Sequence, residues 1–86
     1  MNYELFYHPR SLKFLSKIDR KTSLDLVQKI DNLIIIPLKI KQDIKKLSTA
    51  KNSYRLRVGK IRVVFEIYHQ YKKVYILDID YRGNIY

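Results

Sequence analysis

Arginines gather in a short stretch of the second half of the chain, at a spacing that could place them around one phosphate. Arg55 and Arg57 stand two residues apart in an alternating segment, so their side chains leave the same face of a strand. Arg62 follows a Gly-Lys turn signal on the expected neighbouring strand, within reach of both. Three adjacent like charges repel unless an anion binds between them, which favours a phosphate site. The alternative interpretation is a solvated strand face, partly neutralised by Glu66, Asp78 and Asp80.

Arginine side chains suit one step of RNA cleavage. When a ribose 2′-hydroxyl attacks its own phosphate, negative charge builds up, and preorganised donors stabilise it. Arginine cannot act as the general base, because its pKa above about 12 keeps it protonated. Tyrosines add faces on which unpaired bases could stack, although tyrosine in strands more often covers a core edge. These tyrosines are Tyr54, Tyr68, Tyr81 and Tyr86.

The net charge also indicates a polyanionic partner. The 86 residues include 18 Lys and Arg against 8 Asp and Glu, a formal net charge of +10. From position 45 onward there are ten basic residues and three acids, and a field of this sign attracts nucleic acid. Many small basic domains are charged only for solubility, so this interpretation stays open. The residues expected to contact RNA here are Lys45, Lys46, Lys51, Lys60 and Tyr54.

Several classes of protein and site are disfavoured. Residues 1–86 have room for one domain, and without cysteine neither disulfides nor thiolate metal sites can form. The start lacks a secretory signal, and the longest apolar stretch has four residues, so we expect a cytoplasmic protein without membrane contact. Asp78 and Asp80 share a strand face but lack further ligands, so no metal or small-molecule cofactor is expected. His8 before a helix and His69 in a turn fit structural roles better than catalysis.

The first half predicts one strand and two helices. Residues 3–7 are aromatic-rich and precede His-Pro, which is typical of a strand that leads into a helix. Apolar residues at helical spacing predict a helix over 9–18 and a longer one that ends before Pro37. Asp19 or Thr22 can cap this second helix. The two helices should be antiparallel.

The second half predicts a meander. Residues 37–53 lose periodicity and are expected to form a basic loop with at most one helical turn. Strands are expected over 54–58, 61–68 and 73–80, and residues 81–86 begin with a turn and could add an edge strand.

These elements predict an α+β fold: an N-terminal strand, two antiparallel helices, and a three- to four-stranded antiparallel meander with the helices on one face. The arginines should then point to the opposite, uncovered face.

Three segments resemble the signature of the RelE/ParE toxin superfamily: residues 45–47, the run Tyr54-Arg55-Leu56-Arg57-Val58-Gly59-Lys60-Ile61-Arg62 continuing to residue 67, and residues 82–86. The order of elements is similar too, so the resemblance covers nearly the whole chain. It implies a RelE-like fold. RelE-like members cut messenger RNA in the ribosomal decoding site and are held inactive by an antitoxin, whereas ParE-like members poison DNA gyrase.

The resemblance also implies which residues act. The positions that match the RelE branch are Arg55, Arg57, Arg62, Arg82 and Tyr86. Cleaving members can have lysines at the two strand positions, one of which could take a proton. Both are arginine here, so the resemblance leaves Tyr86 as the base or as a stacking surface, with Arg82 protonating or stabilising the leaving 5′-oxygen. Tyr86 could instead be an edge aromatic that covers the core.

The resemblance thus implies a metal-independent endoribonuclease toxin that leaves a cyclic phosphate and a 5′-hydroxyl. Its expected partners are a RelB-like antitoxin, messenger RNA and the ribosome. A ParE-like gyrase inhibitor and a cleavage-dead RNA-binding domain are the alternatives.

Overall fold

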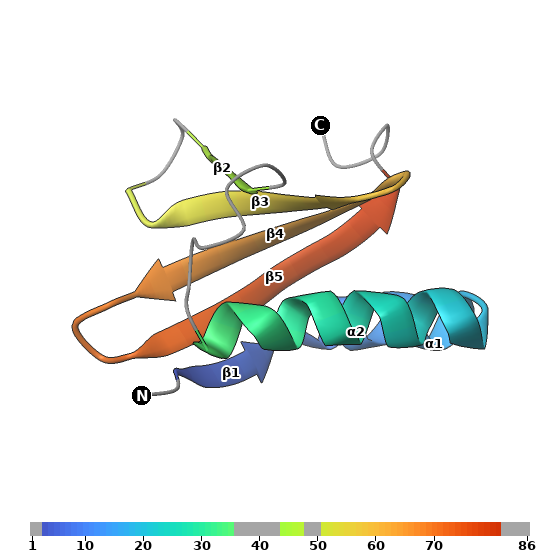
Figure 1. The fold of residues 1–86 in the computed structure, drawn as a ribbon, viewed down its shortest axis with the longest axis horizontal. Helices are drawn as coiled ribbons and strands as arrows, with labels where there is room; N and C mark the ends of the chain where they lie inside the picture. Colours follow the sequence, from blue (N-terminus) through green and yellow to red (C-terminus); the bar gives the residue numbers. More distant parts are fainter. Residues whose placement is uncertain (1–2, 36–43, 48–50, 82–86) are drawn as a thin grey trace.

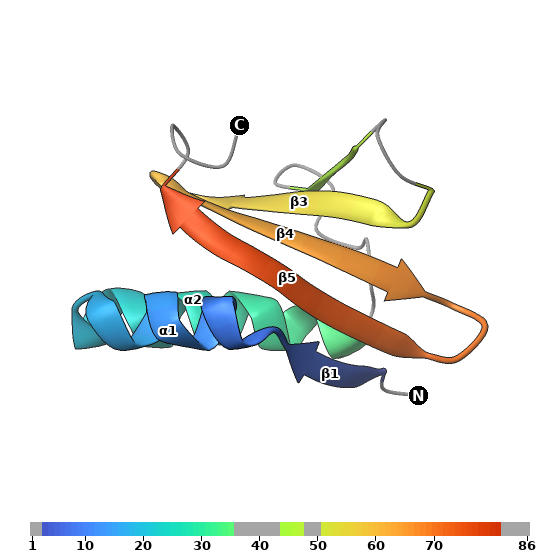
Figure 2. The same cartoon turned by 180° about the vertical axis from the view of Figure 1, so that it is seen from behind.

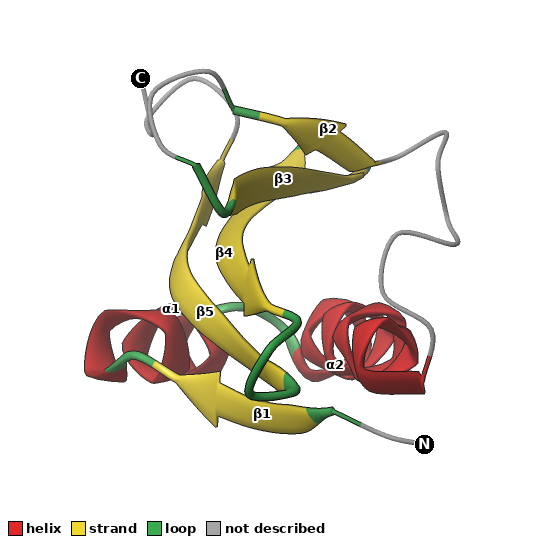
Figure 3. Cartoon of the chain, turned by 90° about the vertical axis from the view of Figure 1, so that its left-hand side faces the viewer, coloured by secondary structure: helices red, strands yellow, loops and turns green. Residues whose placement is uncertain are grey.

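Five strands and two helices form the described part of the chain, residues 3–35, 44–47 and 51–81, in a computed structural model (Figure 1). The two helices run antiparallel near the first and last strands (Figures 1 and 2), and Figure 3 shows them apart, with β1 and β5 between them in that view. The fold is the predicted α+β class. In chain order the elements are β1 (Glu4–Tyr7), α1 (Pro9–Lys17), α2 (Arg20–Ile35), β2 (Ile44–Lys46), β3 (Ser53–Val58), β4 (Ile61–Tyr68) and β5 (Lys73–Tyr81).

Local hydrogen bonds start both helices where the sequence predicts. At α1, the Nδ1 atom of His8 accepts a hydrogen bond from the backbone N of Arg10 at 3.1 Å, and Pro9 follows in the first turn. This confirms the structural role expected for His8. At α2, the carboxylate of Asp19 accepts from the backbone N of Thr22 at 3.0 Å and from its hydroxyl at 2.8 Å. Neither helix is long and apolar enough to cross a membrane, as far as the described residues go.

The hydrogen bonds of Asp19 at the start of α2 make the free energy of unfolding depend on pH. Its hydrogen bonds with Thr22 hold the pKa of Asp19 below the ordinary value of 3.8, so folding favours the ionised form. That contribution is present above the pKa of the unfolded chain and is lost as pH falls through the lower pKa of the folded chain. We expect Asp19→Asn to be less stable than wild type at neutral pH, with a difference that shrinks below pH 3.8. Urea unfolding of both proteins from neutral pH to below pH 3.8 measures the difference in the free energy of unfolding. A difference that does not vary with pH would contradict the prediction.

The five strands form one mixed sheet in the order β1-β5-β4-β3-β2. The N-terminal strand β1 pairs in parallel with β5, and the other neighbours are antiparallel. Gly59 in the β3–β4 turn has a φ of 60°, a backbone region that favours glycine. The sheet twists so that β2 and β3 lie farthest from the helices (Figure 3).

Strand β2 corrects the prediction of a loop over residues 37–53. Residues 44–46 pair antiparallel with β3, with Lys45 opposite Arg55, and the backbone N of Leu47 donates to the carbonyl oxygen of Ser53 at 2.9 Å. The sequence prediction failed because three residues are too short to show a period of two, and adjacent lysines suggest a loop. Lysines are nevertheless well suited to an edge strand, since charge there discourages pairing with another chain.

Side chains from α2 and from one face of the sheet form the core. Phe65 on β4 is fully buried, and Leu26 and Ile30 of α2 pack in the same cluster. Helix α1 is tied to the sheet by the buried Ser11, whose hydroxyl donates to the carbonyl oxygen of Ile76. The other buried core residues are Leu56, Ile61, Val63, Ile67, Val74, Ile76 and Ile79.

Candidate nucleic-acid interface

Alternation along the strands separates the core face from an open face on the other side of the sheet. In β4 the odd-numbered side chains from Ile61 to Ile67 are buried in the core, so the even-numbered ones leave on the open face. Cross-strand partners share a face, and the register therefore assigns the neighbouring strands as well. The open face carries Glu4, Phe6, Lys45, Ser53, Arg55, Arg57, Arg62, Val64, Glu66, Tyr68, Lys73, Tyr75, Asp78 and Asp80.

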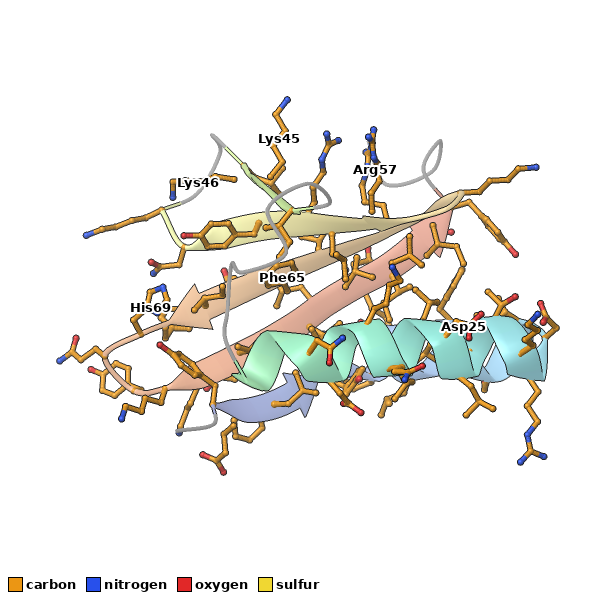
Figure 4. All side chains as sticks on the ribbon, viewed as in Figure 1. Asp25, Lys45, Lys46, Arg57, Phe65 and His69 are labelled. Carbon is orange, nitrogen blue, oxygen red and sulfur yellow. The ribbon has the colours of Figure 1, made fainter. Side chains whose placement is uncertain are left out.

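Four cations lie together at one end of the open face. Arg57 is directly opposite Arg62, which is opposite Asp80. In the next row, Lys45 is opposite Arg55. Lys45 and Arg57 extend from β2 and β3 on the side away from the helices (Figure 4). We call Lys45, Arg55, Arg57 and Arg62 the arginine cluster. The alternation of the sequence predicts the shared face of the three arginines but not the place of Lys45, which was expected in a loop.

Burial differs sharply within the arginine cluster. Arg57 is exposed and Arg55 half-buried, whereas Arg62, on the central strand β4, is only 8% exposed. Arg62 and Arg57 are like charges on paired positions and repel each other, and the carboxylate of Asp80 on the far side of Arg62 offsets part of this cost. Exposed Arg57 can therefore reach a phosphate in solvent, while buried Arg62 supplies a fixed positive charge beneath it.

Two of the residues expected to contact RNA lie on the opposite face. Lys46 and Tyr54 are cross-strand partners, and the Lys46 Nζ atom lies 5.2 Å from the centre of the Tyr54 ring. Tyr54 in turn stacks on Phe65, with ring centres 5.8 Å apart. Lys51 and Lys60 are exposed in turns. Arg82 and Tyr86 lie outside the described residues, and the roles assigned to all of these residues remain predictions.

The described tyrosines whose pKa shifts are resolved are not suited to act as a base. Burial, with a smaller contribution from Asp31, raises the pKa of Tyr7 to about 12. The hydrogen bond from the Tyr68 hydroxyl to Glu66 raises the pKa of Tyr68. Both hydroxyls therefore keep their protons near neutral pH. Nor does the described part of the chain gather three histidine or acidic side chains in a group that could hold a metal ion.

A second feature of the open face is aromatic, and of its residues the sequence analysis named only Tyr68 as a stacking candidate. Tyr75 lies edge-to-face with Tyr68, with ring centres 5.6 Å apart, and stacks on Phe6 of β1 at 5.1 Å. Tyr68 and Tyr75 border a cavity of about 420 Å³ at the end of the face away from the arginine cluster, and Phe6 supports Tyr75 from outside its lining. The alternation of β5 could have suggested Tyr75, but Phe6 joins it only because β1 pairs with β5. We call this cavity the tyrosine groove; its lining residues are Glu66, Tyr68, Tyr71, Lys73, Tyr75 and Leu77.

Comparison with solved structures places this fold among toxins. The toxin of the archaeal RelE–RelB complex from Pyrococcus horikoshii superimposes with a TM-score of 0.85 and 25% identity, covering 98% of this chain and 99% of that one. The RelBE2 toxin–antitoxin complex of Mycobacterium tuberculosis gives a TM-score of 0.78 and 21% identity, covering 95% of this chain and 100% of that one. The RelB–RelE complex of Methanococcus jannaschii gives a TM-score of 0.76 and 23% identity, covering 94% of each chain.

The strand order, the helix pair and the length thus define a small α+β domain of the type solved in toxin–antitoxin complexes. More particularly, the chain has the RelE-like toxin fold. No protein-family model matches the sequence, and no curated protein is significantly similar to it. The resemblance that the motifs indicate is therefore confirmed by the three-dimensional structure.

Proposed function

We propose that this chain is the toxin of a toxin–antitoxin pair and a metal-independent endoribonuclease that cleaves ribosome-bound messenger RNA. The observation that carries the proposal is the arginine cluster, which gathers four cations on the uncovered face of a RelE-like fold. Two further observations support it. The net charge is +10, and similar toxins have been crystallised in complex with RelB antitoxins.

The arginine cluster would stabilise the charge that develops at the phosphate. The 2′-oxygen attacks the adjacent phosphorus as its proton leaves, and the bond from phosphorus to the 5′-oxygen breaks, giving a cyclic phosphate and a 5′-hydroxyl. Arg57 and Arg55 would contact the non-bridging oxygens, since guanidinium groups match phosphate geometry. Arg62 would act beneath them as a fixed charge. Arg82 would protonate or stabilise the leaving oxygen, and Tyr86 would act as the base that takes the 2′-proton or as a stacking surface.

An RNA-binding domain without cleavage is the second candidate function. It is favoured by the chemistry of the arginine cluster, whose three guanidinium groups cannot accept the 2′-hydroxyl proton. Tyr7 and Tyr68 cannot supply the missing base either, because their pKa values are raised and both hydroxyls stay protonated. Cleavage consequently depends on a base other than these three arginines, and a test must separate the two functions.

A RelB-like antitoxin is the proposed protein partner. An acidic or amphipathic segment that covered the arginine cluster would neutralise it and block RNA. This predicts that antitoxin and RNA compete for the same face.

Primer extension on ribosomes stalled at defined codons tests the proposed function. Wild type is expected to cut at codon-defined positions, and Arg82→Ala and Tyr86→Ala are expected to lose those cuts. If the wild-type protein binds RNA but makes no cuts, the result supports the second candidate function, an RNA-binding domain without cleavage. Inhibition of DNA supercoiling without cuts would overturn both in favour of a gyrase poison.

A further inference from the structure

The tyrosine groove lies on the same face of the sheet as the arginine cluster, at its other end. From Arg62 to Glu66 along β4 the separation is four residues, or about 13 Å. The cavity of about 420 Å³ is within the size range of small-ligand pockets, roughly 300–1,000 Å³. A single strand of RNA held by the cluster could reach it within a few nucleotides.

The rings of the groove are arranged for stacking. Tyr75 is held from two sides, by Phe6 stacked at an interplanar angle of 21° and by Tyr68 edge-on at 79°. Tyr71, in the β4–β5 turn, is 64% exposed, so its ring is available to a ligand. Lys73 adds a cation whose Nζ atom lies 5.6 Å from the centre of the Phe6 ring. Aromatic faces beside a cation are the combination by which proteins bind unpaired nucleotides.

Glu66 is the unexpected member of the groove, because an acid should repel RNA. The hydroxyl of Tyr68 donates to its Oε1 atom at 2.9 Å, which fixes the orientation of the carboxylate. An ionised carboxylate has about four lone-pair sites, so it can accept further hydrogen bonds. The amino groups of cytosine and adenine donate to such an acceptor, whereas uracil offers carbonyl oxygens at the corresponding positions.

We propose that the tyrosine groove binds an unpaired base of the RNA strand whose phosphate the arginine cluster holds, and that Glu66 selects bases with an amino group over uracil. The proposal rests on the RNA-binding part of the proposed function. Tyr71 would supply the stacking surface beside the fixed ring of Tyr75, Lys73 would contact the neighbouring phosphate, and Tyr68 would position Glu66.

Binding to a non-cleavable RNA tests this site. The probes are fluorescent 2′-O-methyl oligouridines with a single cytosine or adenine placed at successive positions, and anisotropy gives the affinity. For wild type, one position is expected to bind several-fold more tightly with the amino base than with uracil. Glu66→Gln should lose this preference. Tyr71→Ala should bind all probes roughly fivefold or more weakly, from the loss of one stacking contact.

Controls separate stacking from unfolding and this proposal from the one on which it rests. Tyr71→Phe keeps the ring and should restore affinity, and thermal unfolding of each variant shows whether the domain is intact. If Arg55→Gln/Arg57→Gln loses binding but folded Tyr71→Ala and Glu66→Gln behave as wild type, the groove proposal alone is overturned. A peptide of the antitoxin as the true occupant would give that same result. If the double arginine variant binds RNA as tightly as wild type does, the proposed function is overturned, and the groove proposal that rests on it is overturned as well.

Discussion

Arg55→Gln/Arg57→Gln is expected to lose at least a hundredfold in the rate of RNA cleavage while remaining as stable as wild type. Removing a single preorganised donor from a transition state costs about 10²–10³ in rate, and this variant removes two. Arg57 is exposed and Arg55 half-buried, so neither supports the core. For binding, each lost phosphate contact should reduce the slope of log affinity against log salt by about 0.7 on single strands. Single-turnover cleavage and salt-dependent anisotropy measure the two effects.

A matched variant shows whether position matters or only charge. Lys13→Gln/Lys29→Gln removes the same number of cations from exposed positions on α1 and α2, away from the open face. It should keep the cleavage rate and most of the salt slope. An equal loss in both double variants would show that RNA responds to net charge alone, and the arginine cluster would then not be a site.

Phe65→Ala is expected to lower the free energy of unfolding by about 3–5 kcal/mol, the usual cost of removing a buried phenyl ring. Phe65 is 0% exposed, belongs to the same core cluster as Leu26 and Ile30 of α2, and stacks on the ring of Tyr54. Because small domains have only about 5–15 kcal/mol in total, this one change should leave the domain barely folded. Urea unfolding followed by circular dichroism measures the loss.

Leu24→Ala serves as the control for Phe65→Ala. Leu24 is a large apolar residue of α2 but is 57% exposed, so its truncation should change the free energy of unfolding by no more than about 0.5 kcal/mol. Similar losses in both variants would mean that the core does not have the composition described above.

The sequence predicts the parts of the fold that have strong periodicity. The alternation of β3 and β4 identifies the core face and therefore the face on which Arg55, Arg57 and Arg62 lie, because a strand has only two faces. The helix starts at His8 and Asp19 are also predictable, since capping depends on a few adjacent residues.

Features that depend on contacts between distant segments could not be predicted. Lys46 and Tyr54 seemed suited to RNA binding by residue type, but their faces follow from the register of β2, a strand that the sequence does not reveal. The tyrosine groove likewise needs Phe6 beside Tyr75, residues 69 positions apart that meet through the parallel pairing of β1 with β5.

The same pairing has a consequence for synthesis of the protein. Strand β1 can pair only after residues 73–76 of β5 have been made, so the nascent chain cannot complete the five-stranded sheet before that point. A partly translated chain would lack both the framework that aligns the guanidinium groups and the stability to stay folded. The proposed activity on ribosome-bound messenger RNA should therefore be absent from a nascent chain until β5 has been made.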